Sequence, residues 1–307
     1  MKSSSFSWAK LRSYFVSFFK RIRLPSKRPR VSLHTVLVHV AAWIIAAIWI
    51  IPFLGVFVAS FRPFNEVRFG WWALHPFTIT FSNYVDAWTG QTSGVPLGSA
   101  MFYSLIVAIP ATFLPIIVSA LAAYSFARFK SRTKELLFLM LVLLQTIPQQ
   151  MVIIPIFTLF RDLSLLNNFL GLILLHTAFG LPWQVLFLRN FFSVLPIEVE
   201  EAARVDGASY LRIFRRIVLP LTLPALASLV SLQFVFVWND FFFALTTITD
   251  PRLKLASQTI PLLIGRLQFN FSLLAAGSIL VIILPIALYI ALQRYYVRGL
   301  TAGAVKG

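Results

Sequence analysis

Apolar residues dominate this chain in long runs that do not alternate with polar residues. Six runs, each bounded by charged residues, Pro or Gly, are long enough to cross a bilayer, which takes about 20 helical residues. A transmembrane β-barrel is disfavoured because its strands alternate in polarity. The pattern therefore predicts an all-α polytopic membrane protein with six transmembrane helices, at residues 34–61, 99–126, 135–160, 168–192, 219–246 and 272–295.

Composition indicates the same class. Hydrophobic residues make up 59% of the 307 residues, charged residues make up 12%, and the mean hydropathy is +0.83. Soluble domains carry about twice that share of charged residues. We expect a basic cytoplasmic leader at residues 1–33 and one membrane domain at residues 34–307, with no large soluble domain.

Lys and Arg are distributed unevenly among the predicted loops. With the N-terminus inside, 20 basic residues fall in inside segments and six fall in outside loops. Basic residues near the ends of crossings stay in the cytoplasm, so both termini and the segment 193–218 are predicted to be cytoplasmic. The net charge of +17 is then a topology signal, and no nucleic acid partner is expected.

The leader contains nine basic residues and no acidic one. Apolar residues recur in it at helical spacing, for example at Trp8, Leu11, Phe15 and Phe18. This pattern is typical of an interfacial helix on anionic membrane lipids. A disordered basic leader that only fixes the topology has the same composition, so both interpretations stay open.

The sequence lacks the residues that several kinds of chemistry require. The chain has no Cys, and His34, His39, His75 and His176 show no metal-ligand spacing. It also lacks the Gly-rich phosphate loop that ends in Gly-Lys-Ser/Thr. We therefore expect no enzyme activity, no metal and no cofactor on this chain, and any ATP that is used to be bound by another chain.

The segment 193–218 predicts two short helices joined by a sharp turn. Pro196 favours a helix start, and the glutamates at 198, 200 and 201 suit the positive end of a helix dipole. Gly207 suits the left-handed conformation that ends a helix. In the second helix, Leu211, Phe214 and Ile217 are predicted to share a buried face.

This segment resembles the "EAA" cytoplasmic loop of permease subunits in ATP-binding-cassette (ABC) importers. Three other stretches resemble the carbohydrate-uptake, MalG-like branch of that family: TFSNYVDAW (80–88), VWNDFFFAL and the tail QRYYVRGLTAGAVKG (293–307). The likeness covers roughly residues 35–307. The residues that match the loop pattern are Glu201, Ala202, Ala203, Asp206, Gly207, Ala208, Phe214, Ile217, Leu219, Pro220 and Pro224.

The resemblance implies an ABC type I importer permease fold that forms half of a pore in the cytoplasmic (inner) membrane of a bacterium or archaeon. It also implies a second, MalF-like permease subunit, two ABC ATPase subunits that bind ATP and Mg, and an extracytoplasmic solute-binding protein. The segment 193–218 would be the helix that couples the ATPase to the pore. The coupling residues implied are Glu201, Ala202, Ala203, Asp206, Gly207, Ala208, Leu219 and Pro220.

Polar residues at predicted membrane depth are costly and therefore mark a candidate solute path. Amides beside aromatic rings suit a neutral sugar, although buried glutamines also serve as hydrogen bonds between helices. Pro148, Pro155 and Pro182 interrupt the third and fourth crossings, as hinges, as binding-site breaks or as ordinary kinks. The candidate path residues are Gln145, Gln149, Gln150, Trp183, Gln184, Gln233 and Asn239.

These features predict the permease subunit of an ATP-driven importer for an oligosaccharide or related polyol. One alternative is an importer of glycerol phosphate-type solutes, which requires a cationic cavity. A second is a secondary transporter that works without an ATPase, which is expected to carry ionisable groups at the bilayer midplane. The sequence has no Lys or Arg well inside any crossing and almost no acidic residues there.

Overall fold

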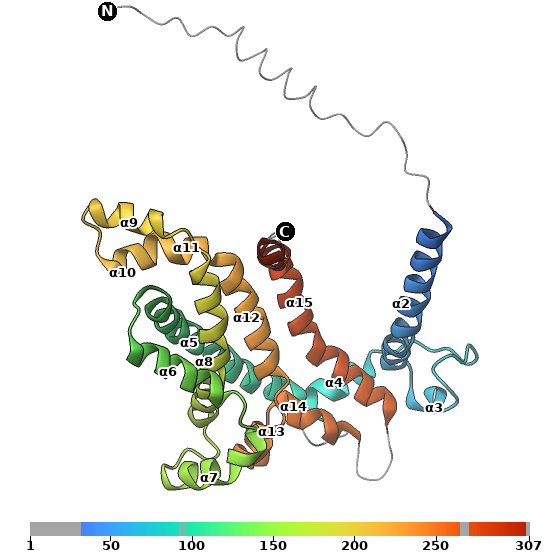
Figure 1. Ribbon diagram of the computed structural model, residues 1–307. Helices are drawn as coiled ribbons and strands as arrows, with labels where there is room; N and C mark the ends of the chain where they lie inside the picture. The colour runs from blue at the N-terminus through green and yellow to red at the C-terminus, as the bar shows by residue number, and fades with distance from the viewer. Residues whose placement is uncertain (1–31, 92–93, 95, 265–269, 305–307) are drawn as a thin grey trace, which may run out of the picture. The chain divides into compact units, whose positions relative to one another are not determined.

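A computed structural model describes residues 32–91, 94, 96–264 and 270–304 (Figure 1). The chain contains two compact units, Met1–Phe53 and Leu54–Gly307. The described part of the first unit is the larger part of helix α2 (Leu33–Ser60), a continuous helix through Pro52. The predicted leader helix falls on residues 1–31, which lie outside the described residues.

Regular structure in the described part of the second unit is helical, with no strand. Its membrane-length helices are α5, α8 and α15, and shorter helices connect them. After the end of α2 the elements are α3 (Phe64–Val67), α4 (Ser82–Thr89), α5 (Leu97–Arg128), α6 (Arg132–Leu144), α7 (Gln149–Asp162), α8 (Phe169–Ser193), α9 (Ile197–Val205), α10 (Tyr210–Ile213), η1 (Phe214–Val218), α11 (Leu219–Leu221), α12 (Leu223–Trp238), α13 (Phe242–Thr247), η2 (Pro251–Leu253), α14 (Ala256–Thr259), η3 (Ile260–Ile264) and α15 (Phe271–Ala304).

Four of the predicted crossings are single helices, namely α2, α5, α8 and α15. The other two are bent pairs: α6 and α7 meet at 99°, and the α10–α11 segment meets α12 at 75°. By length and apolar composition the described residues thus hold four spans, or up to six if each bent pair crosses once. The break in the third predicted crossing (135–160) falls at Pro148, where the sequence predicts an interruption, whereas the uninterrupted crossing predicted at 219–246 is wrong in detail.

A proline lies at one of the two breaks and a hydrogen-bonded threonine lies at the other. Pro148 is the N-cap of α7 and cannot donate a backbone hydrogen bond to the preceding helix. At the other break, the buried Thr222 donates its hydroxyl to the carbonyls of Val218 and Leu219, at 3.0 and 2.9 Å. Pro155 and Pro182 lie inside α7 and α8 and end neither helix, so the predicted binding-site breaks do not occur at these two prolines, while an ordinary kink stays compatible with both.

The core of the second unit forms where α5 packs along α8 and where α12 packs against α5 and α15. Small residues on α5 permit this close approach, as is common between membrane helices. Figure 1 shows α9, α10 and α11 gathered at one end of α5, α8 and α12, and α7 and α13 at the other end. An aromatic cluster of Tyr124, Phe192 and Phe214 fills the core at the α9 end.

A buried ion pair organises the loop after α2. The guanidinium of Arg62 lies 3.2 Å from the carboxylate of Glu66, and both side chains are at most 5% exposed. Arg62 also donates to the carbonyls of Trp71 and Pro76, and the Thr78 N–H donates to Glu66 at 3.0 Å. Hydrogen bonding from Thr78, with a smaller contribution from Arg62, holds the pKa of Glu66 below its usual value. The residues between α2 and α4 are thus held by specific polar contacts.

Gly171, in the first turn of α8, has no room for a side chain. A Cβ there would lie 2.6 Å from the backbone carbonyl oxygen of Leu165. We expect Gly171→Ala to lower the free energy of unfolding by about 1–3 kcal/mol, as overpacked cores do. The check is the midpoint of thermal unfolding of the purified protein in detergent.

The matched control is Gly98→Ala. The three atoms nearest to its Cβ would all belong to the ring of Trp88, the first at 2.8 Å, and this side chain is 50% exposed, so it has room to give way. An equal loss of stability in both variants would contradict the role assigned to the Leu165 carbonyl.

Candidate functional site

The segment 193–218 forms the two helices and the turn that the sequence predicts. Helix α9 begins after Pro196, which is its N-cap, and ends at Asp206. Gly207 has φ +79°, the left-handed conformation, and no atom lies within 4 Å of the position that a Cβ would occupy. The turn is therefore constrained by backbone conformation and leaves open space beside it.

The second helix differs from the prediction in its buried face. α10 passes directly into η1, a π-helical turn that widens the backbone spacing and rotates the residues after it. Ile213, Phe214 and Val218 are buried, whereas Leu211 is 58% exposed. The prediction that Leu211 shares the buried face is wrong, because Ile213 and Phe214 face the core instead. The π-helical turn follows Leu211 and accounts for Val218 being more deeply buried than Ile217.

The implied coupling residues divide into two groups. Ala203, Ala208 and Leu219 pack against the cluster around Tyr124 and Phe214. The others are exposed, and so is Val205, which the sequence reasoning did not select although it lies one turn after Glu201. Val205 is 89% exposed. We call four exposed residues at the C-terminal end of α9 and its cap the α9 surface: Glu201, Ala202, Val205 and Asp206; Arg204, among them, is exposed as well.

Glu200 is turned in the opposite direction from its acidic neighbours and is buried. One carboxylate oxygen lies 2.7 Å from Nη2 and 2.8 Å from Nε of Arg128, and the other accepts the Tyr124 hydroxyl at 2.9 Å. Arg128 also donates to the Leu195 carbonyl at 3.3 Å. From the sequence, Glu200 is predicted only to interact with the positive end of the helix dipole. The missed signal is a Tyr and an Arg four residues apart at the end of an apolar helix.

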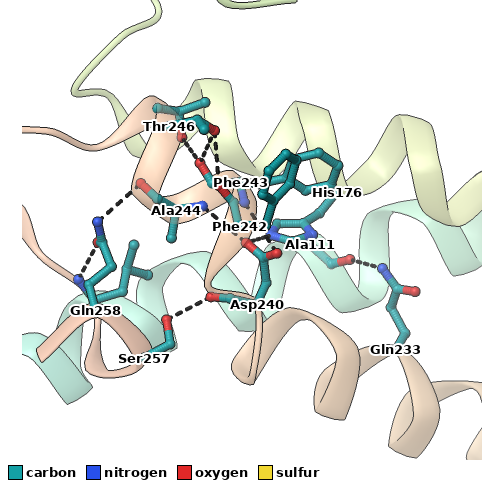
Figure 2. A network of polar contacts seen from close by, with 12 residues as sticks. Ala111, His176, Gln233, Asp240, Phe242, Phe243, Ala244, Thr246, Ser257 and Gln258 are labelled. Carbon is teal, nitrogen blue, oxygen red and sulfur yellow. Dashed lines mark hydrogen bonds and ion pairs between the residues drawn. The ribbon is translucent and has the colours of Figure 1, made fainter. Parts of the chain in front are cut away.

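A second polar group lies at the other end of the helices, where the chain leaves α12. Figure 2 shows the His176 ring beside the Asp240 carboxylate, with 3.6 Å between Nε2 and Oδ2. The Asp240 carboxylate also accepts the backbone N–H groups of Phe243 and Ala244, at 3.3 and 3.1 Å. Asp240 therefore caps the start of α13 and joins it to α8.

Glutamine side chains tie neighbouring backbone segments together in the same region. Gln258 donates to the carbonyls of Ala244 and Ile248 and accepts the Leu255 N–H, all at 3.0–3.1 Å. Gln233 of α12 donates to the carbonyl of Ala111 on α5 at 3.1 Å (Figure 2). These contacts are hydrogen bonds within and between helices.

The candidate path residues also lie in two kinds of place. Gln184 and Gln233 are 0% and 3% exposed, and both amides lie close to Gly180, between α5, α8 and α12. Trp183 is half-buried, with its ring edge-on to Phe236 at 5.9 Å. Exposed amides are found at the α6–α7 break and at the end of α12; these are Gln145, Gln149, Gln150 and Asn239.

An open hollow beside α7 has little polar lining. Its volume is about 290 Å³, and it is lined by Ile153, Ile154, Phe157 and Thr246. A sugar needs several hydrogen-bond partners for its hydroxyls. This hollow alone does not supply them.

Comparison with known proteins identifies the family. The family model "Binding-protein-dependent transport system inner membrane component" matches residues 115–302, from the middle of α5 into α15. The match contains the whole of α8, α9 and α12. More than half of the chain is therefore covered by one family of transport permeases.

Individual relatives are similar over most of their length. The chain is 47% identical to a probable ABC transporter permease protein of Pyrococcus horikoshii, over 87% of this chain and 96% of the relative. It is 41% identical to an osmoprotective compounds uptake permease protein of Synechocystis, over 88% and 91%. An alpha-glucoside transport system permease protein of Rhizobium meliloti is 38% identical, over 76% of this chain and 62% of the relative.

A solved structure has the same fold. It is a chain of a bacterial ABC transporter involved in the import of the acidic polysaccharide alginate, and its similarity covers 89% of this chain and all of that chain. The TM-score is 0.71 at 22% sequence identity. The predicted ABC importer permease fold is confirmed.

The Asp240 cap yields a prediction about stability. Asp240→Ala removes the acceptor for two N–H groups of α13 and should lower the free energy of unfolding by about 0.5–2 kcal/mol. Asp240→Asn keeps one acceptor oxygen and should lower the free energy of unfolding by a smaller amount. The midpoint of thermal unfolding is measured for both purified variants. A larger loss of stability in Asp240→Asn than in Asp240→Ala would contradict the capping role.

Proposed function

Because the chain belongs to the family of binding-protein-dependent transport system inner membrane components, we propose that it forms one half of the pore of an ATP-driven importer. A second permease subunit supplies the other half. Two ABC ATPase subunits bind ATP and Mg at the cytoplasmic side, and a solute-binding protein delivers the solute from outside. Both termini of this chain are cytoplasmic, in the cytoplasmic membrane of a bacterium or archaeon.

The α9 surface is the single observation that carries this proposal. It combines an exposed carboxylate at Glu201, a small side chain at Ala202 and an apolar side chain at Val205. A small residue lets a partner backbone approach closely, an apolar one gains free energy when it is covered, and a carboxylate pairs with a basic partner group. We assign this surface to the ATPase.

The inner face of the same segment supports a mechanical role. Ala203, Ala208 and Leu219 pack against the membrane domain and contribute to its core, so they fix the α9 surface instead of forming it. The role proposed for them is therefore support of the docking helix, while contact with the ATPase is made by the exposed residues. A rigidly mounted helix can pass a displacement to the spans, which then move between inward-open and outward-open states.

The proposed solute is an oligosaccharide or a related polyol. The relatives named for alpha-glucoside and for osmoprotective compounds support a small hydroxyl-rich solute. The exposed Gln145, Gln149 and Gln150 at the α6–α7 break are the amides that a solute reaches without rearrangement of the core. Trp183 and Asn239 are the remaining path residues. For Gln184 and Gln233, burial favours hydrogen bonds between helices.

The two alternatives are less consistent with these contacts. A glycerol phosphate-type solute needs cations along its path, and the basic side chains Arg128 and Arg62 each lie within about 3 Å of a carboxylate. A secondary transporter needs an ionisable group that can exchange its ion. Asp240 instead accepts two backbone hydrogen bonds as the cap of α13.

Docking of the ATPase is tested by co-purification with two variants of the α9 segment. Glu201→Lys reverses the charge of the α9 surface, and Gly207→Val strains the left-handed turn by roughly 1–2 kcal/mol. We expect each variant to retain about tenfold less ATPase than the native chain, as 1.4 kcal/mol implies.

Glu198→Gln and Gly207→Asn are the matched controls. Glu198 is an exposed carboxylate of the same helix outside the α9 surface, and Asn tolerates the left-handed conformation. Retention of the ATPase by Glu201→Lys and Gly207→Val at the level of these controls would refute the docking proposal.

The solute class is tested with the complete transporter, including its binding protein, reconstituted in liposomes. Maltose, trehalose, raffinose and glycerol 3-phosphate are compared as stimulants of ATP hydrolysis. We expect stimulation by at least one of the sugars and none by the phosphate ester, because the exposed path amides suit hydroxyls. Stimulation by glycerol 3-phosphate alone would overturn the sugar assignment.

A further inference from the structure

Glu200 belongs to α9 but makes its contacts with α5. Its carboxylate is 8% exposed, whereas the neighbouring Glu198 and Glu201 are exposed to the surroundings. Arg128 contributes two nitrogens to one carboxylate oxygen, and Tyr124 donates its hydroxyl to the other. Both oxygens of Glu200 are thus bound by a single helix.

Tyr124 and Arg128 lie one helical turn apart at the end of α5. Helix α5 runs the length of the core and packs along α8 over most of that length. By contrast, α9 is joined to its sequence neighbours by two turns, one at Val194–Pro196 and the other at Asp206–Gly207. Bonds from Glu200 therefore attach α9 to residues of α5 that are 72 and 76 positions away in the sequence.

Aromatic contacts also join α5 to the helix that follows the Gly207 turn. Tyr124 packs against Phe214 of η1 with ring centroids 5.0 Å apart, and Phe129 at the end of α5 packs against Tyr210 of α10 at 4.9 Å. The guanidinium of Arg204 lies over the Tyr210 ring at 4.8 Å. Helices on both sides of the Gly207 turn thus contact the same end of α5.

From this geometry we propose that Arg128, Tyr124 and Glu200 form a clamp that makes α5 move together with α9 when the ATPase displaces α9. We call these three residues the α5–α9 clamp. The proposal rests on the function proposed above and adds the path by which the displacement reaches the pore: through α5 as well as through the chain connections to α8 and α12. Tyr124, Arg128 and Glu200 are positioning residues, since none belongs to the α9 surface.

Burial makes the clamp stiff. A shared ion pair with additional hydrogen bonds is short and directional, and separation of its partners leaves an unpaired charge away from water. Such a contact resists gradual stretching, so it is suited to transmit a displacement. The Leu195 carbonyl, which also accepts from Arg128, extends the clamp to the start of the α9 segment.

The test uses the complete transporter with two spin labels on this chain. The chain has no Cys, so Lys130→Cys beside the end of α5 and Ser209→Cys after the Gly207 turn give unique attachment sites. The distance between the labels is measured by pulsed electron paramagnetic resonance, without nucleotide and after trapping with ATP and vanadate. In the native background we expect one distance that trapping leaves unchanged.

Glu200→Gln keeps the size of the side chain and removes its charge. We expect a second, longer distance whose population rises about tenfold on trapping, which corresponds to about 1.4 kcal/mol. Glu198→Gln, with the same charge change on the same helix, should behave as the native chain. Exchange of the partners, Arg128→Glu with Glu200→Arg, should reduce the second population again.

Each outcome bears on the clamp separately from the proposed function. The clamp would be overturned if trapping did not alter the distance between the labels in the Glu200→Gln variant, or if the distance distribution broadened equally in both nucleotide states. Glu200 would then have only a structural role. Co-purification of the ATPase with every labelled variant is measured in parallel. Loss of the ATPase from the native labelled chain would instead contradict the proposed function.

Discussion

Hydrocarbon offers no hydrogen bonds, so each backbone N–H and C=O inside the membrane must find a partner within the protein. Long helices meet this requirement by themselves, and the bent spans meet it with side chains. The Thr222 hydroxyl donates to a backbone carbonyl at the break before α12, and Asp240 caps the start of α13. Gln258 donates to the carbonyls of Ala244 and Ile248. These three polar side chains of the described residues lie where helices stop.

Hydropathy predicted four continuous spans because α2, α5, α8 and α15 satisfy their own backbone groups. Pro148 marked the first bend as an interruption of the third crossing, whereas the bend at Thr222 was not predicted, because the apolar composition continues through it. The turn at Gly207 was predictable since the left-handed conformation is a local preference of the residue. The buried face of the second helix was predicted only at Phe214: Ile213 is buried in place of Leu211, and the π-helical turn that follows shifts the buried face to Val218.

Charge is the harder property to interpret from sequence. Glu198, Glu200 and Glu201 have the same local surroundings in the chain, yet only Glu200 is buried, since its partners Tyr124 and Arg128 come from another helix. Gln184 and Gln233 pose the same difficulty: their depth was predictable, but whether each faces a neighbour or an open path depends on helix rotation. The sequence thus shows which residues are chemically unusual, but it does not show which partners their side chains bind.

The open space around Gly207 has a consequence for how this segment varies among chains. Since nothing crowds the position, the restriction on it comes from the handedness of the chain's own backbone and not from the shape of any neighbour. At this turn a chain of the same fold would therefore accept only residues that tolerate the left-handed conformation, Gly first and Asn next, whatever the shape of the protein beside it.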